Sequence, residues 1–132
     1  MQEHKTSVTD QLSLIKTRLG QGAFRQDLIS HWGGCAVTGY SDPALLVASH
    51  IKPWSKANNQ ERLDPFNGLL LLANLDKAFD SGLISFKQNG LIMLSPHLRN
   101  PEQLGINATM QVDLAPEHQT YMRYHREQVF KA

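Results

Sequence analysis

The chain has little of the material on which several protein classes depend. Its 132 residues include one cysteine, Cys35, which excludes an intramolecular disulfide and a cysteine-rich structural zinc site. No apolar run approaches the roughly 20 residues of a transmembrane helix, and the N-terminus lacks a signal-peptide pattern. These absences predict a cytoplasmic protein with no membrane partner. Cys35, with no sign of activation, is predicted to be a small buried side chain.

Charge is also scarce. Charged residues make up 19% of the chain and the net charge is only +1, so the strongly basic balance of a generic nucleic-acid binder is missing. A local basic face is nevertheless enough to hold phosphates. Two groups of cations would supply such a face: Lys16, Arg18 and Arg25, and Lys52, Lys56 and Arg62. A solvated surface charge is an equally good interpretation of any single member.

The length and the 41% hydrophobic content are typical of one globular domain with a modest core. Apolar residues at helical spacing predict two helices within an N-terminal helical segment at about 8–33. The first covers about 9–19, with Leu12, Ile15 and Leu19 on one face and Gly20 beyond; the second covers about 23–32. The strand-like runs LISF and LIML, separated by QNG, predict a β-hairpin at about 83–95. A last helix is predicted at about 116–130, CAVTGY is β-prone, and SKANNQERLDP is predicted to be a surface loop.

The most informative stretch runs from His50 to Asp80. The apolar run LLVAS predicts a strand that leads into His50, and a polar loop follows it. Asn67 then leads into a second apolar run, GLLLL, and a short amphipathic helix. Asp76 and Asp80 lie four residues apart and so share one face of that helix. An imidazole on a strand and carboxylates on a neighbouring helix can place a base beside a cation, as metal-assisted hydrolysis requires.

The segments ASHIKPW, DPFNGLLL and NLDKAFDSGLISF resemble, in this order, the core of the HNH endonucleases. An upstream CAVTG segment is similar to that of a restriction- or defence-type branch of the family, and the resemblance runs from about Arg18 to Ser95. It implies a single HNH nuclease domain over residues 1–132 with an α+β fold. A ββα-metal (His-Me) finger at about 44–81 would be flanked by the N-terminal helices, the hairpin and the C-terminal helix.

The resemblance also implies roles for three residues. His50 would be the general base, Asn67 would brace the loop and orient His50, and Asp76 would bind a divalent metal ion. Chemistry alone would also let the Asn67 amide oxygen ligate a hard cation. Each of these residues, taken alone, could have a purely structural role. Because the three occur in the same order as in the family motif, the functional roles are favoured. Asp80 is instead interpreted as closing the turn or pairing with Lys77, although its helix face would also let it join Asp76 at the ion.

The sequence departs from the wider family at Ser49. Many HNH enzymes have an acidic or histidine ligand immediately before the base, and a serine hydroxyl is a weaker ligand. One strong protein ligand, Asp76, with waters and a DNA phosphate at the other positions, suits Mg²⁺, which keeps several waters. Mn²⁺ or another transition metal stays open.

The R-x-x-Q-x-x-F-R pattern that starts at Arg18 resembles the entry segment of the family. Arg25 is predicted to reach a phosphate, and a structural ion pair is the alternative. The predicted DNA-binding residues are Arg18, Arg25, Lys52 and Arg62.

The sequence thus predicts a metal-dependent endonuclease acting on DNA, with duplex DNA the favoured form, in restriction or defence. A DNA-binding module of the same fold with little or no cleavage is the alternative, and Ser49 favours it. A homodimer and a recognition or sensor domain outside this chain also stay open.

Overall fold

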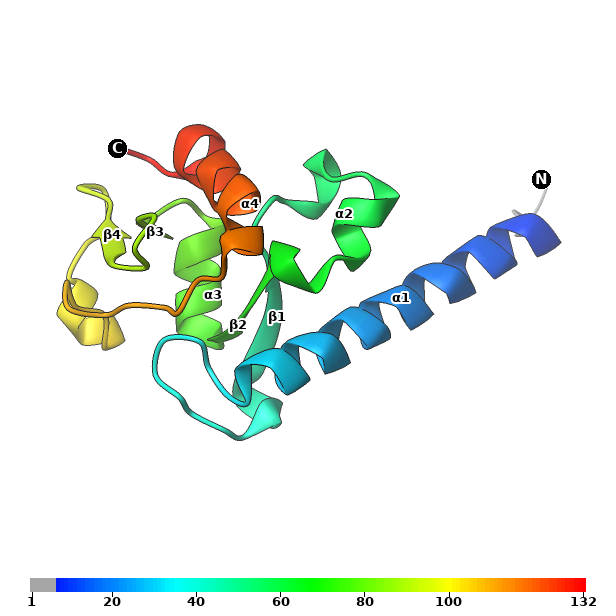
Figure 1. Cartoon of the computed structure of the whole chain (residues 1–132), viewed down its shortest axis with the longest axis horizontal. Coiled ribbons are helices and arrows are strands. Elements are labelled where there is room, and N and C mark those ends of the chain that lie inside the picture. Colours follow the sequence, from blue (N-terminus) through cyan, green and yellow to red (C-terminus); the bar gives the residue numbers. More distant parts are fainter. Residues whose placement is uncertain (1–6) are drawn as a thin grey trace, which may run out of the picture.

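The computed structural model describes residues 7–132 and has the predicted α+β class. Its helices and strands (Figure 1) are α1 (Val8–Trp32), β1 (Leu46–His50), α2 (Asn59–Leu63), β2 (Gly68–Leu72), α3 (Ala73–Asp80), β3 (Ile84–Phe86), β4 (Ile92–Leu94) and α4 (Gln119–Tyr124). A π-helical turn, His125–Val129, continues α4. Short 3-10 turns lie at Pro43–Leu45, Trp54–Lys56, Pro65–Asn67, Pro101–Leu104 and Pro116–His118. Within residues 7–132, no helix combines the length and the apolar character needed to cross a membrane.

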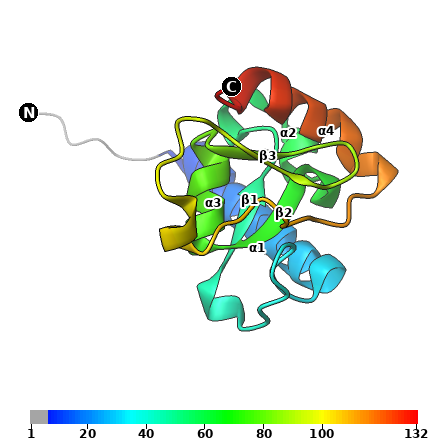
Figure 2. The same cartoon turned by 90° about the vertical axis from the view of Figure 1, so that its left-hand side faces the viewer.

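Strands β1 and β2 form an antiparallel pair between two helices. His50, the last residue of β1, lies opposite Gly68, the first residue of β2. The His50 ring stacks on Phe24 of α1, whereas the Ser49 hydroxyl lies near enough to Asp76 of α3 to influence the pKa of its carboxyl. Because successive side chains of a strand point to opposite faces, α1 and α3 cover opposite faces of the pair, an arrangement that Figure 2 shows from the side. This is the predicted ββα unit with an additional helix against it.

The core lies where this unit meets the C-terminal segment. Three consecutive leucines of β2, residues 69–71, are fully buried because both faces of the strand are covered. Phe79 of α3 and Phe86 of β3 continue the core toward the second hairpin. Cys35 is also buried, which confirms the prediction of a structural thiol.

Helix α1 is one continuous helix, so the prediction of two helices separated near Gly20 is wrong. The helix ends at Gly33, whose backbone is left-handed with φ 70°. An internal glycine such as Gly20 costs only about 1 kcal/mol relative to alanine. Burial of Phe24 and Leu28 against the strand pair contributes about 1.5–3 kcal/mol for each side chain. The free energy gained by packing the second half of α1 is therefore larger than the cost of the glycines in its middle.

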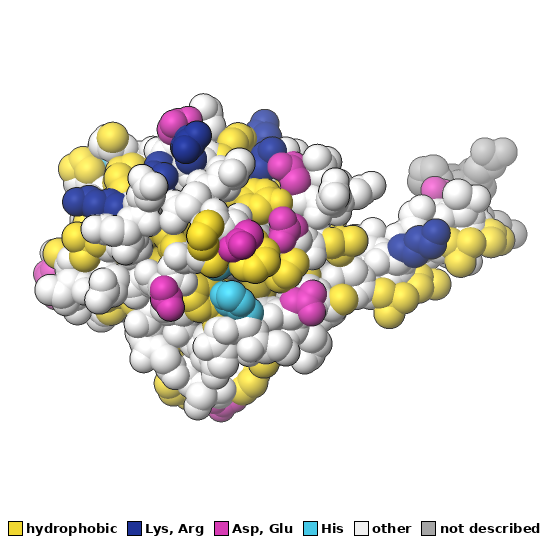
Figure 3. Space-filling model, in the orientation of Figure 1, with side chains coloured by type: hydrophobic (Ala, Val, Ile, Leu, Met, Phe, Trp, Pro, Cys, Tyr) yellow, Lys and Arg dark blue, Asp and Glu magenta, His cyan; other side chains and the backbone are white. Residues whose placement is uncertain are grey.

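The N-terminal half of α1 projects from the rest of the molecule (Figure 1). The apolar side chains predicted to pack there are instead exposed: Leu12 is 53%, Ile15 52% and Leu19 68% exposed. Figure 3 shows hydrophobic side chains along this projecting half. Periodicity identified the helix correctly but not the face that packs, because only the second half of α1 meets the body.

Two other segments differ from their predictions. CAVTGY forms a turn rather than a strand, because the Cys35 N–H donates to the Tyr40 carbonyl at 2.8 Å and closes it. The predicted surface loop contains α2, whose start is held by Asn58: its side-chain oxygen accepts from the Glu61 N–H at 2.8 Å. The β3–β4 hairpin and the C-terminal helical segment are confirmed.

The C-terminal segment is anchored by His125, which is buried. Its ring stacks on Phe79 with 3.8 Å between centroids. Nε2–H donates to the Phe79 carbonyl at 2.9 Å, so Nδ1 accepts from the Ser85 hydroxyl at 2.8 Å. Burial lowers the pKa of His125 to about 4, although the hydrogen bond to Phe79 partly opposes it. The ring is therefore neutral in the folded protein at neutral pH.

We expect this histidine to make folding stability depend on pH. The His125 ring takes up its proton near pH 6.5 in the unfolded chain but only near pH 4 in the folded one. The stabilisation of the folded state by the neutral ring is therefore complete above pH 6.5. It is lost as pH falls through that window, by about 1.4 kcal/mol per pH unit. Urea unfolding at pH 7.5 and pH 5 should show a smaller loss in His125→Gln than in the parent chain. His97→Gln, at an exposed histidine, should keep the full loss.

A pair of glycine substitutions should change stability in opposite directions. A Cβ at Gly22 would meet nothing within 4 Å, so Gly22→Ala should raise the free energy of unfolding by about 0.5–1 kcal/mol. A Cβ at Gly68 would lie 2.6 Å from Phe24 and 2.8 Å from Leu28, where α1 meets β2. Gly68→Ala should therefore cost about 1–3 kcal/mol through overpacking. Thermal denaturation of both variants checks this, and equal shifts would contradict the close contact between α1 and β2.

Candidate active site

Asn67 holds the long connection between β1 and β2 in place. Its side chain is fully buried, and its Oδ1 accepts from the Lys52 N–H at 2.7 Å. Its Nδ2 donates to two carbonyls, of Glu61 at 3.1 Å and of Lys52 at 3.3 Å. One amide thus ties the start of the connection to α2. The Oδ1 atom is engaged within the protein, so this geometry favours the bracing role over metal ligation.

His50 is oriented by the same connection. Its Nε2 lies 2.9 Å from the Arg62 carbonyl oxygen, which can only accept, so Nε2 carries the proton. Within residues 7–132, no hydrogen bond engages Nδ1. Burial lowers the pKa of His50; the hydrogen bond to Arg62 opposes this, and the positive Arg62 side chain adds to it. The ring is therefore a neutral imidazole at pH 7, with its lone pair on Nδ1.

A groove of about 490 Å³ borders His50 along the open edge of β1. Within the described chain, β1 pairs only with β2. The groove is lined by Leu46, Val47, Ala48 and His50 of β1, by Gln21, Phe24 and Arg25 of α1, and by Trp54. Consecutive strand residues point to opposite faces, so a groove lined by both sets lies at the strand edge.

Asp76 lies on the α3 side of β1, beside Ser49. Burial raises the pKa of the Asp76 carboxyl; the hydrogen bond from Ser49 counteracts this, and the negative charge of Asp80 adds to it. A carboxylate in this position gains from a nearby cation, and carboxylate and hydroxyl oxygens are donors that suit Mg²⁺. Within residues 7–132, however, no group of three or more His, Cys, Asp or Glu residues is arranged to hold a metal. The residues present therefore fit an ion whose other ligands are water or substrate.

The four predicted DNA-binding residues lie in different environments. Arg18 is exposed on α1. Arg25 donates to the Leu46 carbonyl at 2.8 Å and to the Pro43 carbonyl at 2.6 Å, so it ties α1 to the start of β1. These contacts are structural, but they are made to carbonyls and not to the acidic partner of an ion pair.

The other two cations also have intramolecular partners. Lys52 forms an ion pair with Glu61 at 3.0 Å. Arg62 donates from Nε to the Trp54 carbonyl at 3.0 Å, and its guanidinium lies 4.4 Å from the centre of the Trp54 ring. Arg62 thus contributes to the site through its carbonyl, which holds His50, as well as through its charge.

Sequence reasoning missed several residues that shape the site. Phe24 was included in the R-x-x-Q-x-x-F-R pattern without a role at the site, yet it stacks on His50 with 4.1 Å between ring centroids. Trp54 contacts His50 edge-on and lines the groove. An aromatic residue four positions after the base was a visible signal, since loop aromatics beside a polar site frequently shape binding surfaces. The contact of Phe24 depends on the crossing of α1 over β1, which no local pattern reveals.

Removal of the Asn67 amide should release the connection. Asn67→Ala leaves the N–H and the carbonyl of Lys52 without partners and removes one of the two hydrogen bonds to the Glu61 carbonyl, so we expect a loss of about 2–4 kcal/mol in the free energy of unfolding. Asn74→Ala removes a single exposed hydrogen bond, to Leu104, and should cost under about 1 kcal/mol. Urea denaturation of the two variants measures the difference. Equal, small losses would show that the amide does not hold the connection.

Comparison with known proteins gives a family match. A family model described as HNH endonuclease matches residues 35–87, which contain β1, β2, α3 and β3. No curated protein matches the chain. A solved structure described as a modification-dependent TagI restriction endonuclease aligns with 78% of this chain at 20% identity and a TM-score of 0.49. The alignment spans 36% of that protein. The family match agrees with the predicted HNH nuclease core, and residues 35–87 of this chain are similar to the HNH endonuclease family.

Proposed function

We propose that the chain is a metal-dependent endonuclease that hydrolyses phosphodiester bonds of DNA, with a role in restriction or defence. The observation that carries this proposal is the state of His50. Its Nε2 is held by the Arg62 carbonyl, its Nδ1 is available, and its pKa is lowered. It borders a groove along a strand edge, one residue away from the Ser49–Asp76 pair.

In this proposal, Nδ1 of His50 takes a proton from a water molecule. The water oxygen forms a bond to phosphorus as the bond from phosphorus to the leaving oxygen breaks. The imidazolium that results stays hydrogen-bonded through Nε2–H to the Arg62 carbonyl, which stabilises its positive charge. Because the folded environment keeps the ring neutral before the reaction, it is in the form that accepts a proton at pH 7.

Asp76 and Ser49 would hold the metal ion, most readily Mg²⁺. A bound divalent ion would offset the charge that develops on the phosphate and on the leaving oxygen. The Ser49 hydroxyl lies near Asp76 and works against the rise in the pKa of its carboxyl, so it favours the charged form that binds a cation. Asn67 acts indirectly, because the connection that it braces carries the Arg62 carbonyl.

Duplex DNA is the proposed substrate, and the strand edge is the proposed place of the scissile phosphate. A phosphate at this edge would lie beside His50, one strand residue away from Ser49; neither Ser49 nor Asp76 lines the groove itself. Arg18 is the predicted DNA-binding residue that is exposed to make contacts. A homodimer and a separate recognition domain stay predictions.

A DNA-binding module without cleavage is the second candidate. The observation in its favour is that Asp76 is the one carboxylate beside Ser49 in the described site, and no three-ligand group surrounds it. A plasmid-nicking assay in Mg²⁺ or Mn²⁺ separates the two candidates, because only an endonuclease converts supercoiled plasmid to the open circle.

We expect His50→Ala to reduce nicking by about 10²–10⁴-fold, the usual contribution of a general base. Asp76→Ala should also remove most activity, and calorimetric titration with Mn²⁺ should show weaker metal binding. His97→Ala and Glu102→Ala, at residues outside the site, are matched controls that should nick at the parent rate.

Circular dichroism of each variant establishes that it is folded. A folded His50→Ala protein that nicks at the parent rate would rule out the general base. Retained Mn²⁺ binding in Asp76→Ala would place the metal ion elsewhere.

A further inference from the structure

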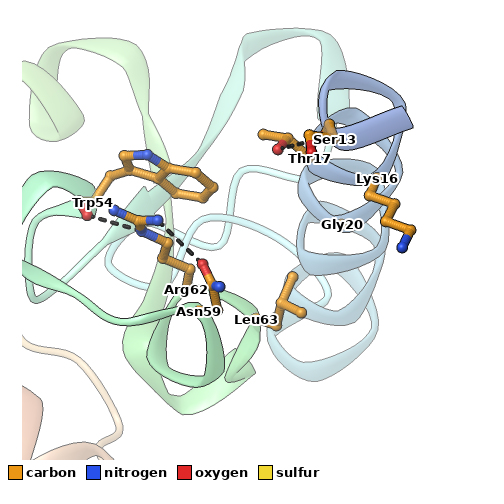
Figure 4. Close-up of a pocket in the computed structure, with 8 residues that line it drawn as sticks. All are labelled: Ser13, Lys16, Thr17, Gly20, Trp54, Asn59, Arg62 and Leu63. Atoms are coloured by element: carbon orange, nitrogen blue, oxygen red, sulfur yellow. Dashed lines mark hydrogen bonds between the residues drawn. The ribbon is translucent and has the colours of Figure 1, made fainter. Parts of the chain in front are cut away.

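A second groove, which His50 and Asp76 do not line, lies between α1 and α2. Its volume is about 450 Å³, and it is lined by Ser13, Lys16, Thr17, Gly20, Trp54, Asn59, Arg62 and Leu63. In Figure 4, Trp54, Arg62 and Asn59 face Ser13, Thr17 and Gly20 of α1 across a gap. The helix side of this groove belongs to the half of α1 that projects from the body.

The lining of this groove is rich in hydrogen-bond donors and has no carboxylate. Lys16 and Arg62 are cations, and Asn59 uses its Oδ1 to accept from Arg62 at 3.2 Å. This leaves the Asn59 amide nitrogen, together with the Ser13 hydroxyl, able to donate to a ligand. Donors and cations without a competing carboxylate favour an anion such as a phosphodiester.

Gly20 lets the two walls meet at the floor of this groove. A Cβ at Gly20 would come within 2.8 Å of the Leu63 side chain, so α2 approaches α1 closely here. This contact accounts for a glycine inside a long helix, at a position that would otherwise favour alanine. The groove is therefore a built feature of the contact between α1 and α2.

The second groove continues the one beside His50. Trp54 lines both, so the two grooves lie next to the same indole, and α1 borders both. A nucleic-acid strand whose phosphate lies beside His50 therefore meets the second groove if it follows α1 past Trp54. Together the two linings hold Lys16, Arg25 and Arg62 but no acidic residue.

Arg62 connects the two places. Its guanidinium lines the second groove and packs on Trp54, while its carbonyl oxygen holds Nε2 of His50. A ligand in the second groove that fixes the Arg62 side chain would also fix the Arg62 carbonyl, and this carbonyl orients His50, the proposed base.

We propose that the groove between α1 and α2 is a subsite for the DNA backbone next to the scissile phosphate. Lys16, Ser13 and Asn59 contact a neighbouring phosphodiester there, and Arg62 links its occupancy to the position of His50. This inference rests on the proposed function and adds a substrate-binding surface to it.

The test measures binding of a fluorescein-labelled DNA duplex to variants in a His50→Ala background, over a series of salt concentrations. Ser13→Phe fills the groove from the projecting half of α1, and Gln11→Phe adds the same bulk at an exposed residue that does not line it. Lys16→Ala removes one cation, and Lys87→Ala removes an exposed one from the β3–β4 turn. We expect Ser13→Phe to weaken binding roughly tenfold, or about 1.4 kcal/mol, because the added ring excludes the phosphodiester from the groove. Lys16→Ala should lower the slope of log affinity against log salt by about 0.9.

The two control variants should bind as the parent does. With His50 intact, Ser13→Phe and Lys16→Ala should raise KM through the lost contacts, and kcat should fall by more than about twofold, because an empty groove no longer orders the Arg62 carbonyl that holds His50. If both groove variants keep the affinity and the salt slope of the parent, and the parent chain nicks DNA, the proposed subsite is wrong while the proposed cleavage stands. A parent chain that binds DNA but does not nick it would overturn the proposed cleavage, whereas the binding data would still decide the subsite.

Discussion

Three hydrogen bonds from the buried amide of Asn67 are the constraint on which the rest of the site depends. They fix the backbone at Lys52, near the start of the connection between β1 and β2, and at Glu61, within α2. The next residue, Arg62, then presents its carbonyl to His50 and its guanidinium to Trp54. A fully satisfied buried amide is stable, whereas a half-satisfied one would be costly. The His50 ring is thus oriented by a main-chain carbonyl, which has less conformational freedom than a second side chain would have.

The sequence was sufficient to predict the ββα unit because its signals are local. A β-prone run ending in His50, a second run after Asn67, and carboxylates one turn apart all show in consecutive residues. The continuity of α1 could not be predicted in this way, because it depends on burial of Phe24 and Leu28 against β2. Local propensity at Gly20 pointed to a break, and tertiary packing outweighed it.

Long-range polar contacts were the second limit of the sequence. Arg25 is an attractive phosphate ligand by type, yet its guanidinium holds two carbonyls that lie 18 and 21 residues away. Lys52 is neutralised by Glu61, nine residues away. The sequence identifies the lysines and arginines that could bind DNA. Their partners in the folded protein decide which of these side chains are free to do so. Lys16, rather than Arg18, lines a groove because the body side of α1 selects one helix face.

The placement of the base and the carboxylate on opposite faces of β1 has a physical consequence. Were both on one face, the negative charge of Asp76 would raise the pKa of His50 and favour its protonated form. Separation by the strand leaves burial as the main influence on each, lowering the pKa of His50 and raising that of Asp76. Both groups are thereby shifted toward their neutral forms in the protein without ligand. A divalent cation beside Asp76 would reverse the shift of the carboxyl, so metal binding and ionisation of Asp76 must be coupled. The groove at the open edge of β1 is lined by His50 but not by Ser49 or Asp76, so a phosphate bound there would meet the imidazole first and the carboxylate only across the strand.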